Sequence, residues 1–87
     1  MLTKQERTEE INKLTSLVNY LIQSEDWKYI YLSECAEPIR LFMWKTGIKY
    51  HRIKLYISTC LGKKFGKEFK LTQQRLKHNA EKLEARL

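Results

Sequence analysis

The chain has 87 residues, of which 43% are hydrophobic and 31% charged, with a formal net charge of +7 at pH 7. At this length we expect one domain, because a single small core buries only about 60–65% of the surface of the unfolded chain. The hydrophobic fraction excludes wholesale disorder, and no apolar run approaches the roughly 18 residues that suggest a membrane span. The composition therefore predicts one small soluble domain over residues 1–87.

The N-terminal segment carries the signals of an amphipathic helix. Thr3 is followed three residues later by Glu6, the spacing of a capping box, in which a hydroxyl and a carboxylate satisfy two amides at a helix start. Apolar residues then recur at steps of three and four along the chain. They are Ile11, Leu14, Val18 and Leu21, with Leu17 and Ile22 widening the stripe. This pattern predicts a helix over residues 4–24.

The two cysteines, Cys35 and Cys60, are too few to form a disulfide framework. Residues 1–10 are almost wholly polar, so we expect no secretory signal peptide. Both observations favour reduced thiols and a cytoplasmic location.

Residues 27–32 are ambiguous between strand and helix. They read Trp-Lys-Tyr-Ile-Tyr-Leu, and this aromatic and β-branched content suits a strand. No second strand is evident to pair with them, and a sheet needs at least one partner strand. We therefore assign this segment to a helix, and the conformation of residues 27–35 stays open.

Pro38 and Gly47 bracket the next predicted helix. Proline suits a first helical turn, where its missing amide hydrogen costs nothing, and glycine suits the residue just beyond a helix end. Between them, Ile39, Phe42 and Met43 are expected to point inward.

The clearest periodicity in the sequence follows Gly47. Apolar residues stand at i, i+3, i+4, i+7 and i+8, which is typical of one buried helix face. They are Ile53, Tyr56, Ile57, Cys60 and Leu61. Gly62 follows as a stop signal, so the pattern predicts a helix over residues 48–61.

The remaining segment is predicted to hold a basic turn and a last helix. Residues 63–71 mix lysines with Phe65 and Phe69, which suggests a turn held by two aromatic anchors. Thr72 can then cap a helix over residues 72–87. The elements together predict an all-α fold, a small bundle of four to five helices.

The last helix carries a heptad-like apolar seam. Its members are Leu76, Ala80, Leu83 and Leu87. The seam predicts either a contact between two subunits or a helix packed on its own domain. A core in a domain of this size contributes only about 3–5 kcal/mol, which favours a homodimer through the terminal helices.

The positive charge is concentrated in the middle of the chain. Residues 1–37 carry a net charge of −3, residues 38–67 carry +8 with no acidic residue, and residues 68–87 carry +2. A segment without acids cannot neutralise itself locally, so it attracts a polyanion and releases counterions on meeting phosphates. The alternative is a solvated basic face that the acidic first third partly cancels after folding.

Residues 38–58 resemble the helix-turn-helix of DNA-binding proteins, and the alternative for the same residues is an ordinary αα-hairpin. The resemblance lies in the turn and in the apolar positions around it, namely Phe42, Gly47, Ile48, Ile53 and Tyr56. Two residues depart from the pattern: Met43 stands where a small residue is usual, and Thr46 where an apolar residue is usual.

The resemblance implies that the second helix lies in the major groove with its N-terminal residues at base edges. Lys49, Tyr50 and His51 would then approach bases, with Lys54 one turn further on, and the other basic residues would reach phosphates. Tyr50 either stacks on a base or covers the edge of the core, and Leu55 touches a thymine methyl, Trp44 or a second subunit. The candidate nucleic-acid contacts are Arg40, Lys45, Lys49, Tyr50, His51, Arg52, Lys54, Lys63, Lys64 and Lys67.

Other chemistries find little support in the sequence. Cys35, His51, Cys60 and His78 are separated by gaps of 16, 9 and 18 residues, without the close pairs that zinc sites use. Nothing indicates an oxyanion hole or a substrate pocket for a Cys/His pair, and three scattered glycines make no phosphate loop. We expect no enzyme activity, metal, cofactor or small-molecule substrate.

The function favoured by these patterns is nucleic-acid binding, as a DNA-binding transcriptional regulator or accessory factor. One alternative is a protein-interaction module, an adaptor or inhibitor that grips an acidic partner. Another is an RNA-binding protein, although aromatic strand motifs and a GXXG loop are absent from the sequence. No membrane partner is expected.

Overall fold

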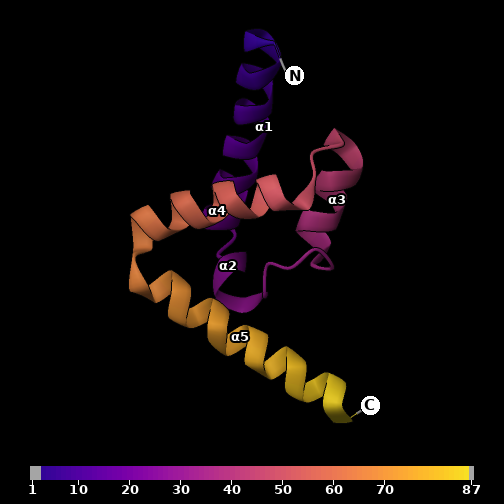
Figure 1. Ribbon diagram of the computed structural model, residues 1–87. Helices are drawn as coiled ribbons and strands as arrows, with labels where there is room; N and C mark the ends of the chain where they lie inside the picture. The colour runs from indigo at the N-terminus through magenta and orange to yellow at the C-terminus, as the bar shows by residue number, and fades with distance from the viewer. Residues whose placement is uncertain (1–2, 87) are drawn as a thin grey trace.

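The computed structural model describes residues 3–86, with side chains as far as Leu83, and this part of the chain forms five helices and no strand. The helices are α1 (Lys4–Gln23), α2 (Asp26–Tyr29), α3 (Glu37–Thr46), α4 (Tyr50–Phe65) and α5 (Lys67–Arg86). In Figure 1, α4 crosses α1, α3 stands beside the start of α4, and α5 runs back from the far end of α4. The predicted all-α bundle of four to five helices is confirmed.

Helix α1 begins where the sequence predicts. The Thr3 hydroxyl accepts a hydrogen bond from the Glu6 amide at 3.1 Å and donates one to the Glu6 carboxylate. Leu14, Leu17, Val18 and Leu21 of the inward stripe are buried, whereas Ile22 is half-buried and Ile11 is 51% exposed. Thr15 and the Tyr56 hydroxyl share a hydrogen bond of 2.7 Å, which ties α1 to α4.

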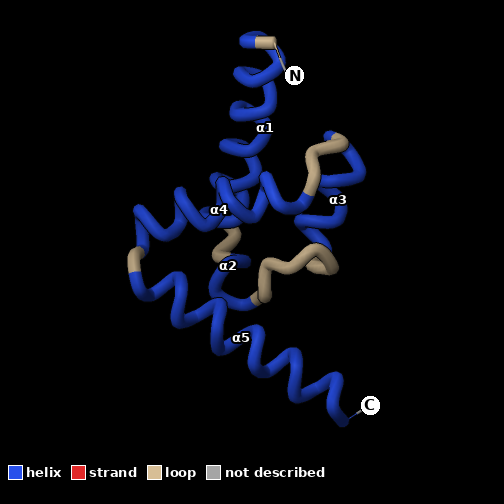
Figure 2. Tube along the Cα trace, in the orientation of Figure 1, coloured by secondary structure: helices blue, strands red, loops and turns tan. Residues whose placement is uncertain are grey.

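The helix predicted over residues 27–32 is wrong beyond Tyr29, because α2 ends there and a loop leads to α3 (Figure 2). The cause is a single side chain of α5. The Gln73 amide donates to the carbonyls of Trp27 and Ile30, at 2.7 and 3.0 Å, and its oxygen accepts from the Leu32 amide at 2.9 Å. These bonds satisfy the loop backbone without a helix.

Helix α3 matches its prediction. Pro38 lies in its first turn, and Gly47 ends it with a left-handed φ of 73°. The turn to α4 is organised by Thr46, whose hydroxyl donates to the Phe42 carbonyl at 2.7 Å and accepts from the Ile48 amide at 3.2 Å. This bonding explains why a polar residue stands there in place of an apolar one.

Helix α4 starts two residues later and ends four residues later than the predicted 48–61. The predicted stop at Gly62 is wrong, because Gly62 lies inside the helix. The helix continues because Phe65 stacks on the buried Trp27, with ring centroids 4.5 Å apart. The break comes at Gly66, whose φ of 61° and ψ of −134° suit glycine alone.

The predicted basic turn over residues 63–71 and the cap at Thr72 are also wrong, because α5 begins directly after Gly66. The two aromatic anchors are confirmed, since Phe69 also packs on Trp27, at 6.1 Å. In the predicted seam, Leu76 and Ala80 are half-buried and Leu83 is 64% exposed. The fourth member, Leu87, lies outside the described residues.

The core lies where α1, α2, α4 and α5 meet, and Ile39 of α3 completes it. Its fully buried members are Leu21, Trp27, Ile39, Ile53 and Leu61. No polar or charged side chain is buried among the described residues. Within residues 3–86, no helix is long and apolar enough to cross a membrane.

Candidate nucleic-acid interface

Helices α3 and α4 form the predicted hairpin around a turn at residues 47–49. Ile53 is fully buried, while Phe42, Met43 and Tyr56 are half-buried against the core. The hairpin therefore has the apolar contacts that the helix-turn-helix pattern requires.

The four predicted base contacts do not share one face. Tyr50 is half-buried and donates its hydroxyl hydrogen bond to the Leu32 carbonyl at 3.2 Å, so it covers the edge of the core. Burial raises its pKa, and the neighbouring Tyr31 and Glu34 raise it further. Lys54 lies on the side of Tyr50, facing α5, whereas Lys49 and His51 border α1.

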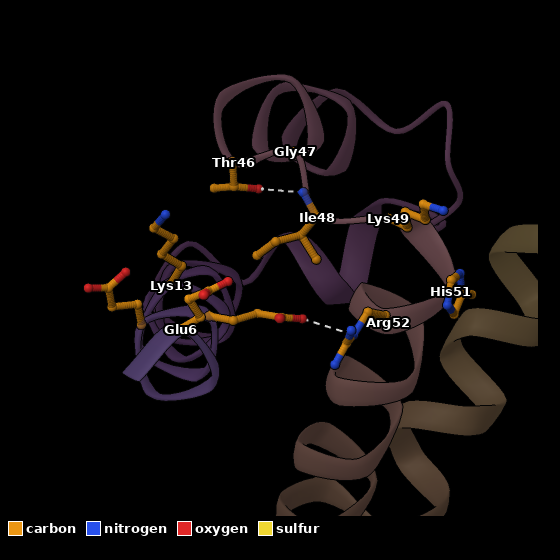
Figure 3. A pocket seen from close by; sticks show the side chains of 10 residues that line it. Glu6, Lys13, Thr46, Gly47, Ile48, Lys49, His51 and Arg52 are labelled. Atoms are coloured by element: carbon orange, nitrogen blue, oxygen red, sulfur yellow. Dashed lines mark hydrogen bonds and ion pairs between the residues drawn. The ribbon is translucent and has the colours of Figure 1, made fainter. Parts of the chain in front are cut away.

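The start of α4 carries acidic side chains next to the basic ones. Glu6, Glu9 and Glu10 of α1 line a hollow that Lys49 and Arg52 also border; we call it the mixed-charge hollow. Arg52 Nε lies 2.9 Å from Glu10 Oε1, and Figure 3 shows this ion pair bridging the two helices. A phosphate entering the hollow would meet these three carboxylates beside Lys13, Lys49 and Arg52, so the basic residues there do not act as an uncompensated positive patch.

Two candidates, Arg40 and Lys45, lie exposed on α3. The same helix exposes 81% of Trp44 and 43% of Leu41. Leu55, which is 70% exposed, lines a groove between α1 and α4 together with Ile11. Trp44 is absent from the lining of that groove, which we call the α1–α4 groove.

The remaining candidates lie on the α4–α5 hairpin, all of them exposed. Lys63, Lys64 and Lys67 surround the break at Gly66, at the left-hand corner of the molecule in Figure 1; we call them the corner lysines. Lys54 of α4 and Lys70 of α5 both line a cleft between these helices, and we call these two the cleft lysines.

Charge on this hairpin is strongly unbalanced. Residues 50–86 hold ten Lys and Arg residues against three Asp and Glu residues. Two ion pairs form among the described side chains, Lys28 with Glu25 and Arg52 with Glu10. Neither uses a corner or a cleft lysine, so no carboxylate of the described side chains pairs with any of these five.

Lys70 is the residue that the sequence reasoning missed. The acid-free segment ends at Lys67, because Glu68 follows it, so charge counting alone leaves Lys70 outside the basic segment. A helix starting at residue 67 would have placed Lys70 one turn from Lys67, on the side that faces α4. The helical spacing of Lys67 and Lys70 could therefore have predicted this residue, but only with the first residue of α5 placed correctly.

Nothing else in the described residues assigns a chemistry. No group of three His, Cys, Asp or Glu side chains there could hold a metal ion. Cys35 is an exposed free thiol and Cys60 a half-buried one. Comparisons of the chain with protein-family models, curated proteins and solved structures find no match.

Proposed function

We propose that this protein binds nucleic acid through the phosphate backbone, using the corner and cleft lysines of the α4–α5 hairpin. The observation that carries the proposal is their exposure without ion pairs, on a hairpin whose ten basic residues face only three acidic ones. Each lysine that meets a phosphate releases condensed counterions, which is the main source of affinity in such contacts.

Duplex DNA is the first candidate ligand, and the protein would act on it as a small regulator or accessory factor in the cytoplasm. The carboxylates beside Arg52 argue against deep insertion of the α4 start into the major groove. Contact through the hairpin lysines alone reads the backbone and carries little sequence information. RNA is the alternative ligand, and a homodimer through the terminal helices is the assembly proposed with it.

A titration of duplex DNA in rising salt tests this function. If the five lysines each neutralise one phosphate, log K falls against log salt concentration with a slope near −4 to −5. A slope near zero, or the absence of binding to both DNA and RNA at low salt, would reject the proposal.

A protein-interaction module is the second candidate, and α3 is the feature that favours it. Trp44 is 81% exposed between Arg40 and Lys45, a surface suited to an acidic partner with an apolar contact. Capture from a nuclease-treated lysate separates the two functions. A partner that survives the nuclease and is lost with Trp44→Ala supports this second candidate.

A further inference from the structure

The cleft between α4 and α5 has an apolar floor. Leu32 of the loop before α3, Ile57 and Phe69 form this floor, and the fully buried Ile39 lies behind it. The cleft is open to solvent on one side and has a volume of about 190 Å³. Pockets for drug-sized ligands span about 300–1,000 Å³, so this cleft admits one small ring system rather than a large molecule.

Polar side chains at the mouth of the cleft are available to a ligand. Gln73 and Tyr50 direct their hydrogen bonds into the loop before α3. Ser58 and Gln74, by contrast, are exposed at the mouth and make no side-chain hydrogen bond within the described part of the chain. An apolar floor with a few free polar groups around it is the usual composition of a ligand site.

The charge at the mouth distinguishes this cleft from two other hollows on the molecule. The mixed-charge hollow contains three glutamates, and the α1–α4 groove contains Glu10. The α4–α5 cleft is lined by Lys54 and Lys70 and by no acidic residue. Glu34 lies close enough to help raise the pKa of Tyr50, but it does not line the cleft.

From this geometry we propose that the α4–α5 cleft receives one unpaired base of a nucleic acid, with Lys54 and Lys70 holding the phosphates on either side of it. The inference rests on the proposed function and adds a single-stranded ligand to the backbone contacts proposed for the duplex. Base-paired nucleotides cannot enter, because their rings are stacked inside the duplex. A single-stranded or looped segment offers a planar ring for the floor and Tyr31, and a phosphate for each lysine.

The test compares a labelled oligothymidylate of about 12 nucleotides with a blunt duplex of equal length, by fluorescence anisotropy. Ser58→Trp fills the mouth of the cleft without changing the charge. We expect it to raise the Kd for the single strand about tenfold, the scale of one lost base contact, and to leave the duplex Kd within about twofold. Thr59→Trp places the same bulk in the α1–α4 groove and serves as the matched control.

A second pair of variants keeps the test independent of folding defects at Ser58. Lys54→Gln with Lys70→Gln should weaken the single strand more than the duplex, whereas Lys63→Gln with Lys67→Gln should weaken both equally. An oligouridylate arm shows whether the base comes from DNA or RNA. If the duplex binds but no cleft variant changes the ratio of the two Kd values, the inference fails and the proposed function stands. If neither nucleic acid binds at low salt, both fail.

Discussion

Arg52 of α4 and Glu10 of α1 form an ion pair of 2.9 Å, with 14% of the Glu10 side chain exposed and 51% of that of Arg52. The pair occupies the end of α4 that the helix-turn-helix pattern would direct at DNA. Charge in the first third of the chain therefore offsets part of the basic middle after folding, as the alternative interpretation of the sequence anticipated.

Replacing Glu10 by glutamine should strengthen nucleic-acid binding. The change removes a carboxylate from the mixed-charge hollow and frees Arg52 for a phosphate, so we expect affinity to rise by about two- to fivefold at low salt. Glu9→Gln removes the same charge from the same hollow without breaking the ion pair. Anisotropy titrations that give equal gains for both variants would show that releasing Arg52 contributes nothing.

Gln73 should contribute far more to stability than its neighbour Gln74. Gln73→Leu leaves the carbonyls of Trp27 and Ile30 and the Leu32 amide without their partner, which costs about 2–4 kcal/mol. Gln74→Leu changes an exposed residue and should stay within about 0.5 kcal/mol. Urea unfolding of both variants checks this difference, and similar midpoints would contradict the role given to Gln73.

The two glycines near the corner should respond in opposite directions to alanine. Gly62 lies inside α4 with no atom within 4 Å of an added Cβ, so Gly62→Ala should stabilise the protein by about 0.5–1 kcal/mol. Gly66 also has open space but a φ of 61° and a ψ of −134°, so Gly66→Ala should destabilise it by about 1–3 kcal/mol. Thermal unfolding measures both, and a shift of the same sign would be inconsistent with these conformations.

Tyr50 should make stability fall in alkaline solution. Its pKa is raised above the ordinary 10.0 by burial and by the nearby Tyr31 and Glu34. The unfolded chain therefore loses this proton first, so the stabilisation is complete below the unfolded pKa and is lost as pH rises through the folded pKa.

In Tyr50→Phe the unfolding free energy should consequently decline less steeply than in the wild type between about pH 9 and 11. Tyr29 is 72% exposed. Tyr29→Phe, which removes the hydroxyl of this exposed residue, is the matched control. Denaturant titrations across this pH range give the slopes. Identical slopes for the wild type and Tyr50→Phe would rule out this effect.

Local signals predicted much of the fold. Thr3 with Glu6 marked the start of α1, and Pro38 with Gly47 bracketed α3, because caps and turns depend on neighbouring residues. The same local rules predict a helix end equally well at Gly62 and at Gly66. What separates them is the distant Trp27, which holds Phe65 and extends α4 past Gly62.

The candidate site was predictable only in part for the same reason. The exposed lysines follow from composition and helix boundaries, so four of the five hairpin lysines were identified. The pairing of Arg52 with Glu10 joins residues 42 positions apart, and the hydrogen bond of Tyr50 reaches the loop before α3. Contacts between residues so far apart in the chain produce no periodic pattern in a single sequence, so they could not be predicted from it.

The most direct test of the central claim is the salt dependence of duplex binding in two charge-matched variants. Lys63→Gln, Lys64→Gln and Lys67→Gln together remove the corner lysines. Lys4→Gln, Arg7→Gln and Lys13→Gln remove the same charge from α1. We predict that the corner variant reduces the magnitude of the slope of log K against log salt by about 2 to 3, while the α1 variant leaves it nearly unchanged. Equal reductions in both variants would contradict the account, because binding would then follow net charge rather than the α4–α5 hairpin.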